Sequence, residues 1–550
     1  MRLMYMVQQD SKANQMPVEL KKQVIHDLDI QKLANYISMD GIYTISADEL
    51  MDMMSYDPAT IKYRQQLSKV LFNNQNLYNE FFRLYQKLQG LREIASNTSR
   101  AIDRSVSNHV RAVKWIDLFG TLISDLVDIF NKYPETGGVE SLVRLKNKVF
   151  EISQSDEYKV MVKNINQMKT DGHKLDSIVM GVNLNDYLEP VGVNCLQVDD
   201  FYYYPQKMVE IRKNGKKHHG IGKFKYHPAG RKKQGDIRYD EMRAPAVLAD
   251  TTKFQRFVSC EINIEYVKSL DSFLKSLNFN NNNIIKKYVL EKIKSTLGLA
   301  DDLGFFLGGI KMAKKLSNMK MPVSLPETSE EENYLTINDI YNCYLPFVIN
   351  NPSDEIVLND FNLNREYSYS ILNGPNKGGK TTFIQGLCLT VILFQLGLYC
   401  PCSKAKINPF DMILTHYLNE EKESRTGRLS AEADEIKKIF SHATGKSLVI
   451  FNEPFVSTSP AEGRYLMLSA LAGVRELGFR GIFVTHYHKL NEQVENDNDD
   501  ACQKISFLNM GINAEGSSGG LRTYELIKGR GEVKSFAMDI LKEYAPDLLD

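Results

Sequence analysis

One short motif constrains the fold of this chain more than any other feature. Residues 374–381 read Gly-Pro-Asn-Lys-Gly-Gly-Lys-Thr and match the pattern G-x-x-x-x-G-K-[ST]. An apolar run, Tyr369–Leu372, precedes the motif, and apolar residues at helical spacing follow it. Because a phosphate-binding loop joins a strand to the first turn of a helix, this context predicts a P-loop within an α/β domain.

The residue types of the motif suit a polyphosphate bound at a helix N-terminus. Gly374, Gly378 and Gly379 would let backbone N–H groups turn around the β-phosphate, where the helix dipole favours anions. Lys380 is predicted to contact the β- and γ-phosphates, and Thr381 to ligate Mg²⁺. The alternative is a chance glycine-rich turn, which the flanking strand and helix disfavour. The predicted nucleotide-binding residues are Gly374, Pro375, Asn376, Lys377, Gly378, Gly379, Lys380, Thr381 and Thr382.

Two further apolar runs end in polar residues that suit phosphate chemistry. The run Ser447–Phe451 leads into Asn452 and Glu453, and Glu453 is a candidate general base. A second run ends at Val484, and His486 follows it, so its imidazole would face the γ-phosphate. A single histidine at a strand end is usually structural, but this one follows the P-loop and the glutamate in the expected order.

Composition restricts the class of protein without revealing its partners. The chain has 550 residues, of which 43% are apolar and 25% charged, as in globular proteins with several cores. Lys+Arg and Asp+Glu are both 68, so affinity for nucleic acid must come from local clusters of charge. The seven cysteines include no paired C-x-x-C motifs, and no apolar stretch reaches the length of a membrane span. These features favour a soluble, cytoplasmic protein in which Cys400-Pro-Cys402 provides buried thiols instead of a redox pair.

The pattern of apolar residues changes along the chain. Helical spacing dominates up to about residue 130, the run Ile178–Leu184 resembles a strand, and helical spacing returns from about Thr252 to Lys315. After Pro322 and an acidic loop, strand-like runs alternate with helical ones, which predicts a mostly parallel sheet. The strand candidates are 369–372, 447–451, 481–484 and 506–510. We place domain boundaries after residues 195, 260 and 330, which gives the predicted domains 1–195, 196–260, 261–330 and 331–550.

Residues 207–233 form a cationic segment, which we call the basic island. It contains ten Lys or Arg residues and a single acid, Glu210, and its glycines and proline predict loops or a ribbon. Two interpretations stay open: a solvated face, or a tip that binds the phosphates of DNA. Its histidines have no second ligand pair at zinc spacing, so we reject a zinc site. The candidate DNA-binding residues are Lys213, Lys216, Lys217, Lys223, Lys225, Arg231, Lys232 and Lys233.

Four motifs together resemble one known family. The segments GPNKGGKTT, PCSKAKINPFDMILTHY, SLVIFNEPFVSTSPAEG and FVTHYHKL are similar to the ATPase domain of the MutS family of DNA mismatch-repair proteins, which are relatives of ABC ATPases. The resemblance covers the chain from about Asp339 onward. Upstream, the segment that begins Asp57-Pro-Ala-Thr resembles, more weakly, the start of the family's helical core and lever domain.

The resemblance implies an architecture and a mode of action. It implies an α-helical core and lever domain with a clamp-like insertion, followed by an α/β P-loop ATPase domain of the ABC/MutS type. Each ATP, with Mg²⁺ held by Thr381 and Asn452, would lie between the P-loop of one subunit and a segment, 425–432, of the other. Ser457-Thr-Ser459 would face the partner subunit. The implied catalytic residues are Lys380, Glu453 and His486, and the implied trans residues are Arg428, Ser430 and Glu432.

This sequence departs from the family pattern at four points. Asn452 stands where family members carry Asp, so we expect a weaker Mg²⁺ site and slower hydrolysis. Gly427-Arg-Leu replaces the usual serine of the trans segment, and two candidates for its substitute stay open, Arg428 and Ser430. Ile356 occupies the position of an aromatic residue that often stacks on adenine. No mismatch-reading domain with a Phe-x-Glu wedge precedes the core, so we expect little recognition of single mismatches.

Two hypotheses about function follow. The first is a MutS-like, ATP-dependent DNA-binding homodimer of DNA repair or recombination, which closes around double-stranded, branched or damaged DNA. It would be cytoplasmic, and nucleoid-associated in a bacterium. The second is a nucleotide-switched interaction protein with weak or no ATPase activity and no direct contact with DNA, which Asn452 and the altered trans segment favour.

Overall fold

A computed structural model describes most of the helical and α/β regions of the chain. Contacts within the chain divide it into two compact units. The first unit contains Met1–Gln86, Ile129–Asn147 and Gly298–Asp550, and the second contains Lys87–Asp128 and Lys148–Leu297. The described residues are 3, 16–39, 43–98, 106–172, 177–184, 190–199, 210–213, 216–219, 294–332, 334–417, 427–456, 458–487, 490–498, 504–513 and 521–529.

Two of the amino-terminal helices, α3 and α4, begin at side chains that cap them. Ser46 and Glu49 form a capping box at the start of α3. Asp57 accepts hydrogen bonds from the N–H groups of Ala59 and Thr60 at the start of α4, where Pro58 occupies the first turn. These helices are α1 (Val18–Asp27), α2 (Ile30–Ile37), α3 (Ala47–Asp52), α4 (Pro58–Asn73), α5 (Gln75–Thr98), α6 (Val106–Lys132), α7 (Glu140–Gln154) and α8 (Asp156–Gly172).

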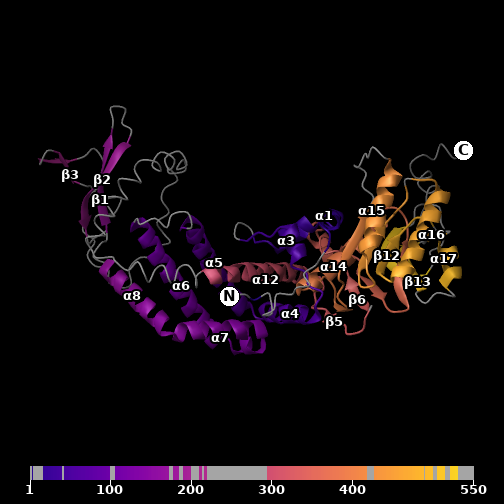
Figure 1. Ribbon diagram of the computed structural model, residues 1–550, viewed down its shortest axis with the longest axis horizontal. Helices are drawn as coiled ribbons and strands as arrows, with labels where there is room; N and C mark the ends of the chain where they lie inside the picture. The colour runs from indigo at the N-terminus through magenta and orange to yellow at the C-terminus, as the bar shows by residue number, and fades with distance from the viewer. Residues whose placement is uncertain are drawn as a thin grey trace. The chain divides into compact units, whose positions relative to one another are not determined.

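The second unit ends in two antiparallel strand pairs, visible with α8 in Figure 1. The predicted strand at 178–184 is confirmed as β1 (Ser177–Leu184), which pairs with β2 (Pro190–Asp199). Within the basic island, β3 (Glu210–Lys213) pairs with β4 (Lys216–His219), so this part of the island is a ribbon. Helix α5 continues through the polar pair Ser96-Asn97 and ends at Thr98.

The carboxy-terminal part of the first unit is built on a six-stranded sheet with the order β10-β11-β12-β8-β13-β14. All neighbouring strands are parallel except β13 and β14. The four predicted strands are confirmed as β8, β11, β12 and β13. The strands are β8 (Tyr367–Asn373), β10 (Ile413–Tyr417), β11 (Leu448–Asn452), β12 (Arg480–Val484), β13 (Lys504–Asn513) and β14 (Leu521–Lys528).

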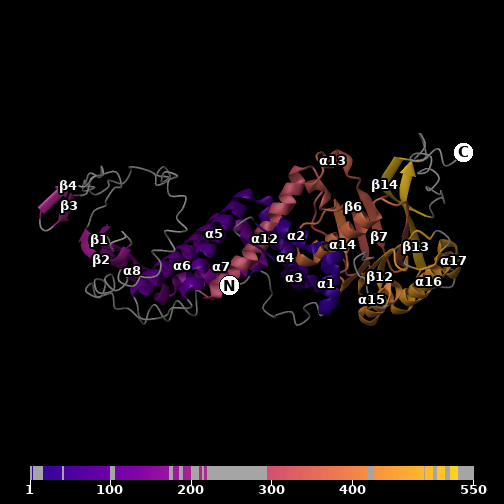
Figure 2. The same cartoon turned by 90° about the horizontal axis from the view of Figure 1, so that it is seen from above.

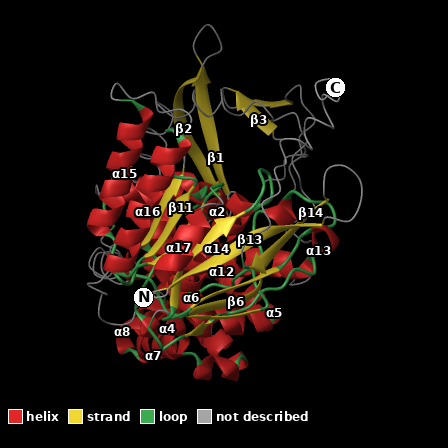
Figure 3. Cartoon of the chain, turned by 90° about the vertical axis from the view of Figure 1, so that its right-hand side faces the viewer, coloured by secondary structure: helices red, strands yellow, loops and turns green. Residues whose placement is uncertain are grey.

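Helices cover both faces of this sheet. Figures 1 and 2 place α14 on the side of the sheet toward β6, and α16 and α17 on the opposite side. Figure 3 looks onto this part of the molecule and shows the strands running between helices. The helices are α12 (Lys294–Asn318), α13 (Pro352–Glu355), α14 (Lys380–Leu396), α15 (Arg428–His442), α16 (Pro460–Leu477) and α17 (Leu490–Asn498). No helix in the described ranges is long and apolar enough to cross a membrane.

Helix α14 is the centre of this core. From Phe383 to Leu396 almost every side chain is buried, which explains why the helix is apolar on all faces. It ends at Gly397 in the left-handed conformation (φ +76°), where an added Cβ would lie 2.4 Å from the Cβ of Arg64. Ser68 of α4 donates a hydrogen bond to the Gly397 carbonyl at 2.8 Å. The P-loop helix is therefore packed directly against α4.

A second, four-stranded sheet with the order β5-β9-β6-β7 lies beside α14. The predicted acidic loop after Pro322 differs from the structure because Glu327–Thr328 pairs in parallel with Lys406–Ile407. The strands are β5 (Glu327–Thr328), β6 (Leu335–Ile340), β7 (Asn359–Leu363) and β9 (Lys404–Ile407). The predicted domain boundaries at 195, 260 and 330, and the clamp-like role of the insertion, stay predictions.

Four cysteines whose side chains are described are free and buried. Burial raises the pKa of Cys343 to about 12 and the pKa of Cys402 to about 11, and it also raises the pKa values of Cys388 and Cys400. Cys400 donates to the Thr390 carbonyl at 3.3 Å, and Cys402 lies 3.3 Å from the Ser324 hydroxyl. These contacts confirm the prediction that Cys400 and Cys402 are buried thiols.

We predict that these four thiols resist alkylation in the native protein at pH 8. A raised pKa leaves little reactive thiolate, and burial blocks the reagent. N-ethylmaleimide labelling followed by peptide mass spectrometry should find them unmodified in native protein and fully modified after unfolding in urea. Rapid native labelling of Cys400 or Cys402 would contradict the packing described above.

Candidate functional site

The candidate site lies where four central strands of the sheet end. Strand β8 lies between β12 and β13, and the loop 374–379 connects it to α14. The parallel strands β11, β12 and β8 are neighbours, so their carboxyl ends meet at one edge of the sheet. Ligands of open parallel sheets bind at this edge. The topology therefore brings together residues that are far apart in the sequence.

The loop 374–379 curls tightly because three of its residues have positive φ angles. The φ angles are +146° at Gly374, +59° at Lys377 and +92° at Gly379. A Cβ at Gly374 would lie 2.8 Å from the Cβ of Met510, so only glycine fits there. Gly379 occupies the N-cap position of α14 and supplies no side-chain cap. The first N–H groups of the helix are thus suited to an anion.

Lys380 is buried inside this curl. Its Nζ donates hydrogen bonds to the carbonyls of Gly374 at 2.9 Å and Pro375 at 3.0 Å, and lies 3.6 Å from Oε1 of Glu453. Burial lowers the pKa of Lys380, and the nearby charge of Glu453 only partly opposes this effect. The ammonium group is therefore held next to the anion-binding turn.

Glu453 and His486 converge from neighbouring strands. Glu453 follows β11 directly, with a left-handed backbone (φ +55°), and His486 lies two residues beyond β12. His486 Nε2 is 2.7 Å from Glu453 Oε1. Burial raises the pKa of Glu453, but His486 and Lys380 together leave it below its ordinary value. The carboxylate is thus ionised at neutral pH and oriented by two partners.

The residues expected to hold Mg²⁺ fit such an ion. Asn452 Oδ1 is buried and accepts no hydrogen bond from any described residue, so it is an oxygen that still needs a positive partner. Thr381 is exposed in the first turn of α14, beside the anion-binding turn. Oxygen donors of these two kinds, completed by phosphate and water oxygens, are what Mg²⁺ prefers.

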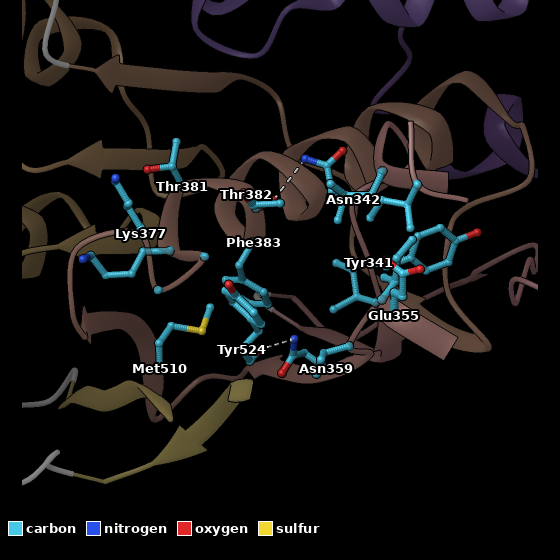
Figure 4. A pocket seen from close by; sticks show the side chains of 18 of the residues that line it. Tyr341, Asn342, Glu355, Asn359, Lys377, Thr381, Thr382, Phe383, Met510 and Tyr524 are labelled. Atoms are coloured by element: carbon cyan, nitrogen blue, oxygen red, sulfur yellow. Dashed lines mark hydrogen bonds between the residues drawn. The ribbon is translucent and has the colours of Figure 1, made fainter. Parts of the chain in front are cut away.

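A cavity of about 450 Å³ extends from the P-loop toward β6. Figure 4 shows Lys377 and Thr381 at one end and Tyr341 at the other, with Phe383 between them. The tyrosine Tyr524 of β14 also lines the cavity. One end is polar and the other aromatic, as a nucleotide requires. The lining includes Ile340, Tyr341, Asn342, Leu345, Ile349, Glu355, Ile356, Val357, Asn359, Lys380, Thr382, Glu453 and Met510.

Tyr524, which was not among the predicted site residues, contributes an aromatic ring to the cavity that Ile356 also lines. A Cβ at Gly379 would lie 3.1 Å from the Tyr524 ring, so the ring lies beside the P-loop. Asn359 holds this part of β14, since it donates to the Tyr524 carbonyl at 3.2 Å and accepts from Leu526 N–H at 2.6 Å. The strand-like pattern of residues 521–528 could have indicated the strand that carries Tyr524, but this run was not among the predicted strands.

The expected trans residues occupy different environments. Ser430 is exposed on the first turn of α15, and Arg428 begins that helix, although its side chain lies outside the described residues. Glu432 is only 6% exposed and faces the interior of its own chain. Residues 425 and 426 lie outside the described residues, as does Ser457, whereas Ser459 caps α16 by accepting a hydrogen bond from Glu462 N–H.

The candidate DNA-binding residues are only partly described. The β3–β4 register places Lys213 opposite Lys216 and Arg212 opposite Lys217. A two-stranded ribbon therefore brings four cations together along the backbone. The remaining candidates, Lys223, Lys225, Arg231, Lys232 and Lys233, lie outside the described residues.

The fold and the site define a class of protein. A mainly parallel sheet carries a P-loop after a central strand, and the next strands along the edge supply a glutamate and a histidine. The carboxy-terminal part of the chain is thus a P-loop domain of the α/β class.

Comparison with known proteins finds a similarity in the carboxy-terminal part of the chain. The model of MutS domain V matches residues 370–543. Endonuclease MutS2 of Clostridium perfringens (strain SM101 / Type A) is 30% identical over 215 residues, which cover 38% of this chain and 26% of that protein. DNA mismatch repair protein MutS of Geobacillus sp. (strain WCH70) is 30% identical over 191 residues, or 33% and 22% of the two chains. Residues 370–543 are therefore similar to domain V of the MutS family, and the chain spans about a quarter of the length of these relatives.

Proposed function

We propose that this protein binds and hydrolyses ATP with Mg²⁺ and uses the nucleotide to control its binding to DNA. The observation that carries the ATPase proposal is the convergence of Lys380, Glu453 and His486 at the P-loop. The relatives named above act in mismatch repair or as an endonuclease, according to their names, and this supports a role in DNA repair.

In the proposed mechanism each of these residues has a role during hydrolysis. The N–H groups at the start of α14 and the ammonium of Lys380 bind the β- and γ-phosphates. Glu453 orients the attacking water and accepts its proton as the new O–P bond forms and the bond from γ-phosphorus to the ADP oxygen breaks. His486 holds the carboxylate and, next to it, donates to the γ-phosphoryl oxygens. Mg²⁺, held by Thr381 and Asn452, would neutralise charge that develops on the phosphates.

The cavity supports a nucleoside triphosphate as the ligand. Its polar end adjoins Lys377 and Thr381, and its far end contains Tyr341, Phe383 and Tyr524. An aromatic ring offers a stacking surface of the kind that a nucleobase uses. We infer that Tyr524 contributes this surface in place of the residue at position 356.

Replacing Lys380 should abolish tight nucleotide binding. We expect Lys380→Ala to weaken ATP·Mg²⁺ affinity about 10- to 100-fold, because hydrogen bonds to charged groups contribute roughly 1.5–3 kcal/mol. Fluorescence titration with a mant-labelled ATP measures the affinity. Lys437→Ala removes an exposed lysine from α15 and should leave it unchanged. Full affinity in Lys380→Ala would reject the P-loop assignment.

Replacing Glu453 should separate binding from hydrolysis. We expect Glu453→Gln to bind ATP within about threefold of the unmodified protein and to lose on the order of 100-fold or more in kcat, as for loss of a general base. Phosphate release under single-turnover conditions measures the rate. Glu476→Gln, an exposed site on α16, is the matched control. Hydrolysis that survives in Glu453→Gln would exclude Glu453 as the base.

A second candidate function is a nucleotide-switched interaction protein that hydrolyses little ATP and does not touch DNA. The uncharged Asn452 beside the phosphate site favours it, because an amide oxygen holds Mg²⁺ less strongly than a carboxylate. Steady-state turnover with and without DNA distinguishes the two functions. Mg²⁺-dependent hydrolysis that DNA stimulates would exclude this second candidate.

Neutralising the β3–β4 ribbon should weaken DNA binding in a salt-dependent way. We expect the double variant Lys216→Ala/Lys217→Ala to reduce the slope of log K against log [salt] by about 2, since each phosphate contact contributes roughly 0.9. Filter binding of double-stranded and branched DNA at two salt concentrations measures this slope. The double variant Lys404→Ala/Lys437→Ala, at exposed positions of the first unit, should keep the original slope. An unchanged affinity in the ribbon variant would reject the ribbon as a DNA contact.

A further inference from the structure

A buried carboxylate on α15 connects that helix to the turn that carries Glu453. Glu432 is 6% exposed, and its Oε1 accepts a hydrogen bond from the Phe455 N–H at 2.5 Å. The same oxygen lies 3.3 Å from Nε2 of His416, at the end of β10. One side chain thus joins a helix, a strand and the loop after β11. A buried carboxylate without hydrogen-bond partners would destabilise the folded state. The contacts of Glu432 therefore hold the three segments together.

The turn after β11 has an unfavourable backbone that needs such support. Glu453 and Phe455 both adopt left-handed conformations, with φ angles of +55° and +61°. Neither is a glycine, and a side chain with a Cβ is strained in this region of backbone conformation. The Glu453 N–H is fixed to the Val484 carbonyl at 3.1 Å, and the Phe455 N–H is fixed by Glu432. The two hydrogen bonds lie on either side of the turn that aims the Glu453 carboxylate.

His416 keeps the Glu432 carboxylate in place. Its other ring nitrogen, Nδ1, lies 3.4 Å from Glu435 Oε2, one turn further along α15. The preceding residue, Thr415, donates to the buried Asp27 carboxylate of α1 at 2.8 Å. The histidine thus lies between two carboxylates of α15. Its own strand is hydrogen-bonded to α1 through Thr415. Glu432 has little freedom to turn away from Phe455.

Helix α15 also begins at the segment expected to meet the partner's nucleotide. Helix α15 starts at residue 428, and Glu432 lies four residues later, about one helical turn away. A shift of the helix start would therefore move the Glu432 carboxylate as well. The described residues contain a continuous path from the start of α15, through Glu432 and the Phe455 N–H, to Glu453.

We propose that Glu432 is a positioning residue for hydrolysis: it fixes the turn that orients Glu453 and couples this turn to the start of α15. This inference rests on the proposed ATPase function. Glu432 does not touch the nucleotide in this assignment, so it affects the rate of the chemical step and leaves ground-state binding alone. The start of α15, which is expected to face the nucleotide of the partner subunit, would thereby affect the orientation of Glu453 at its own subunit's nucleotide.

The test compares variants that keep or remove the acceptor oxygen. Glu432→Gln keeps the oxygen that accepts from the Phe455 N–H and faces His416, so kcat should stay within a few-fold of the unmodified protein. Glu432→Ala removes the acceptor, and Glu432→Asp retracts it while keeping the charge; both should lower kcat about 10- to 100-fold with the KM for ATP nearly unchanged. Glu435→Gln is the matched comparison, because it removes a charge from the same histidine without touching Phe455, and it should lower kcat less than Glu432→Ala does.

A double variant adds a readout that general destabilisation would not produce. Glu432→Ala/Glu453→Gln should hydrolyse ATP no more slowly than Glu453→Gln in single-turnover assays, because Glu432 acts through Glu453. Mant-ATP affinity and circular dichroism monitor binding and folding, and Glu432→Asp replaces Glu432→Ala if the latter does not fold. Loss of kcat in Glu435→Gln equal to that in Glu432→Ala would overturn the proposal, as would full kcat in Glu432→Asp. If the unmodified protein hydrolyses no ATP, the proposed function itself fails.

Discussion

The ion pair between Lys380 and Glu453 is the interaction on which the site depends. A buried ammonium group beside backbone carbonyls and a carboxylate is stable only if all of these groups keep their positions. Each comes from a different element: Lys380 from the start of α14, Gly374 and Pro375 from the loop after β8, and Glu453 from the loop after β11. The parallel register of β8, β12 and β11 brings Lys380 and Glu453 to the same edge of the sheet, so the ion pair depends on this register.

The fold supports this pair through the burial of α14. An apolar helix between two sheets has only one rotational setting that fills both interfaces without voids. Gly397 lets α4 approach the end of the helix, and Gln395 is tied by its amide to the Ser55 and Phe410 carbonyls at 3.2 and 2.9 Å. These contacts link the amino-terminal helices to the P-loop. The packing of α4 therefore affects the position of α14 and, through it, the P-loop.

The carboxyl edge of the sheet carries two histidine–carboxylate pairs with different roles. His486 and Glu453 are partly exposed and face the P-loop cavity. His416 and Glu432 are buried, and burial lowers the pKa of His416 while hydrogen bonds to Glu432 and Glu435 raise it more, so the net direction is upward. The first pair faces the P-loop, and the buried pair contacts the turn after β11 through the Phe455 N–H. Phe451 of β11, whose ring centroid is 6.4 Å from that of His416, packs beside the buried pair.

Local pattern determined the elements, and tertiary packing decided their contacts. The sequence alone predicted the P-loop, the four strands 369–372, 447–451, 481–484 and 506–510, and the order of Lys380, Glu453 and His486, because each follows from local periodicity and backbone chemistry. It did not predict that Glu432 faces its own chain or that Tyr524 reaches the cavity. These depend on which strands become neighbours, and strand order is set by long-range packing that no local window contains. The contacts of Glu432 and Tyr524 therefore depend on the tertiary positions of β10, β14 and α15.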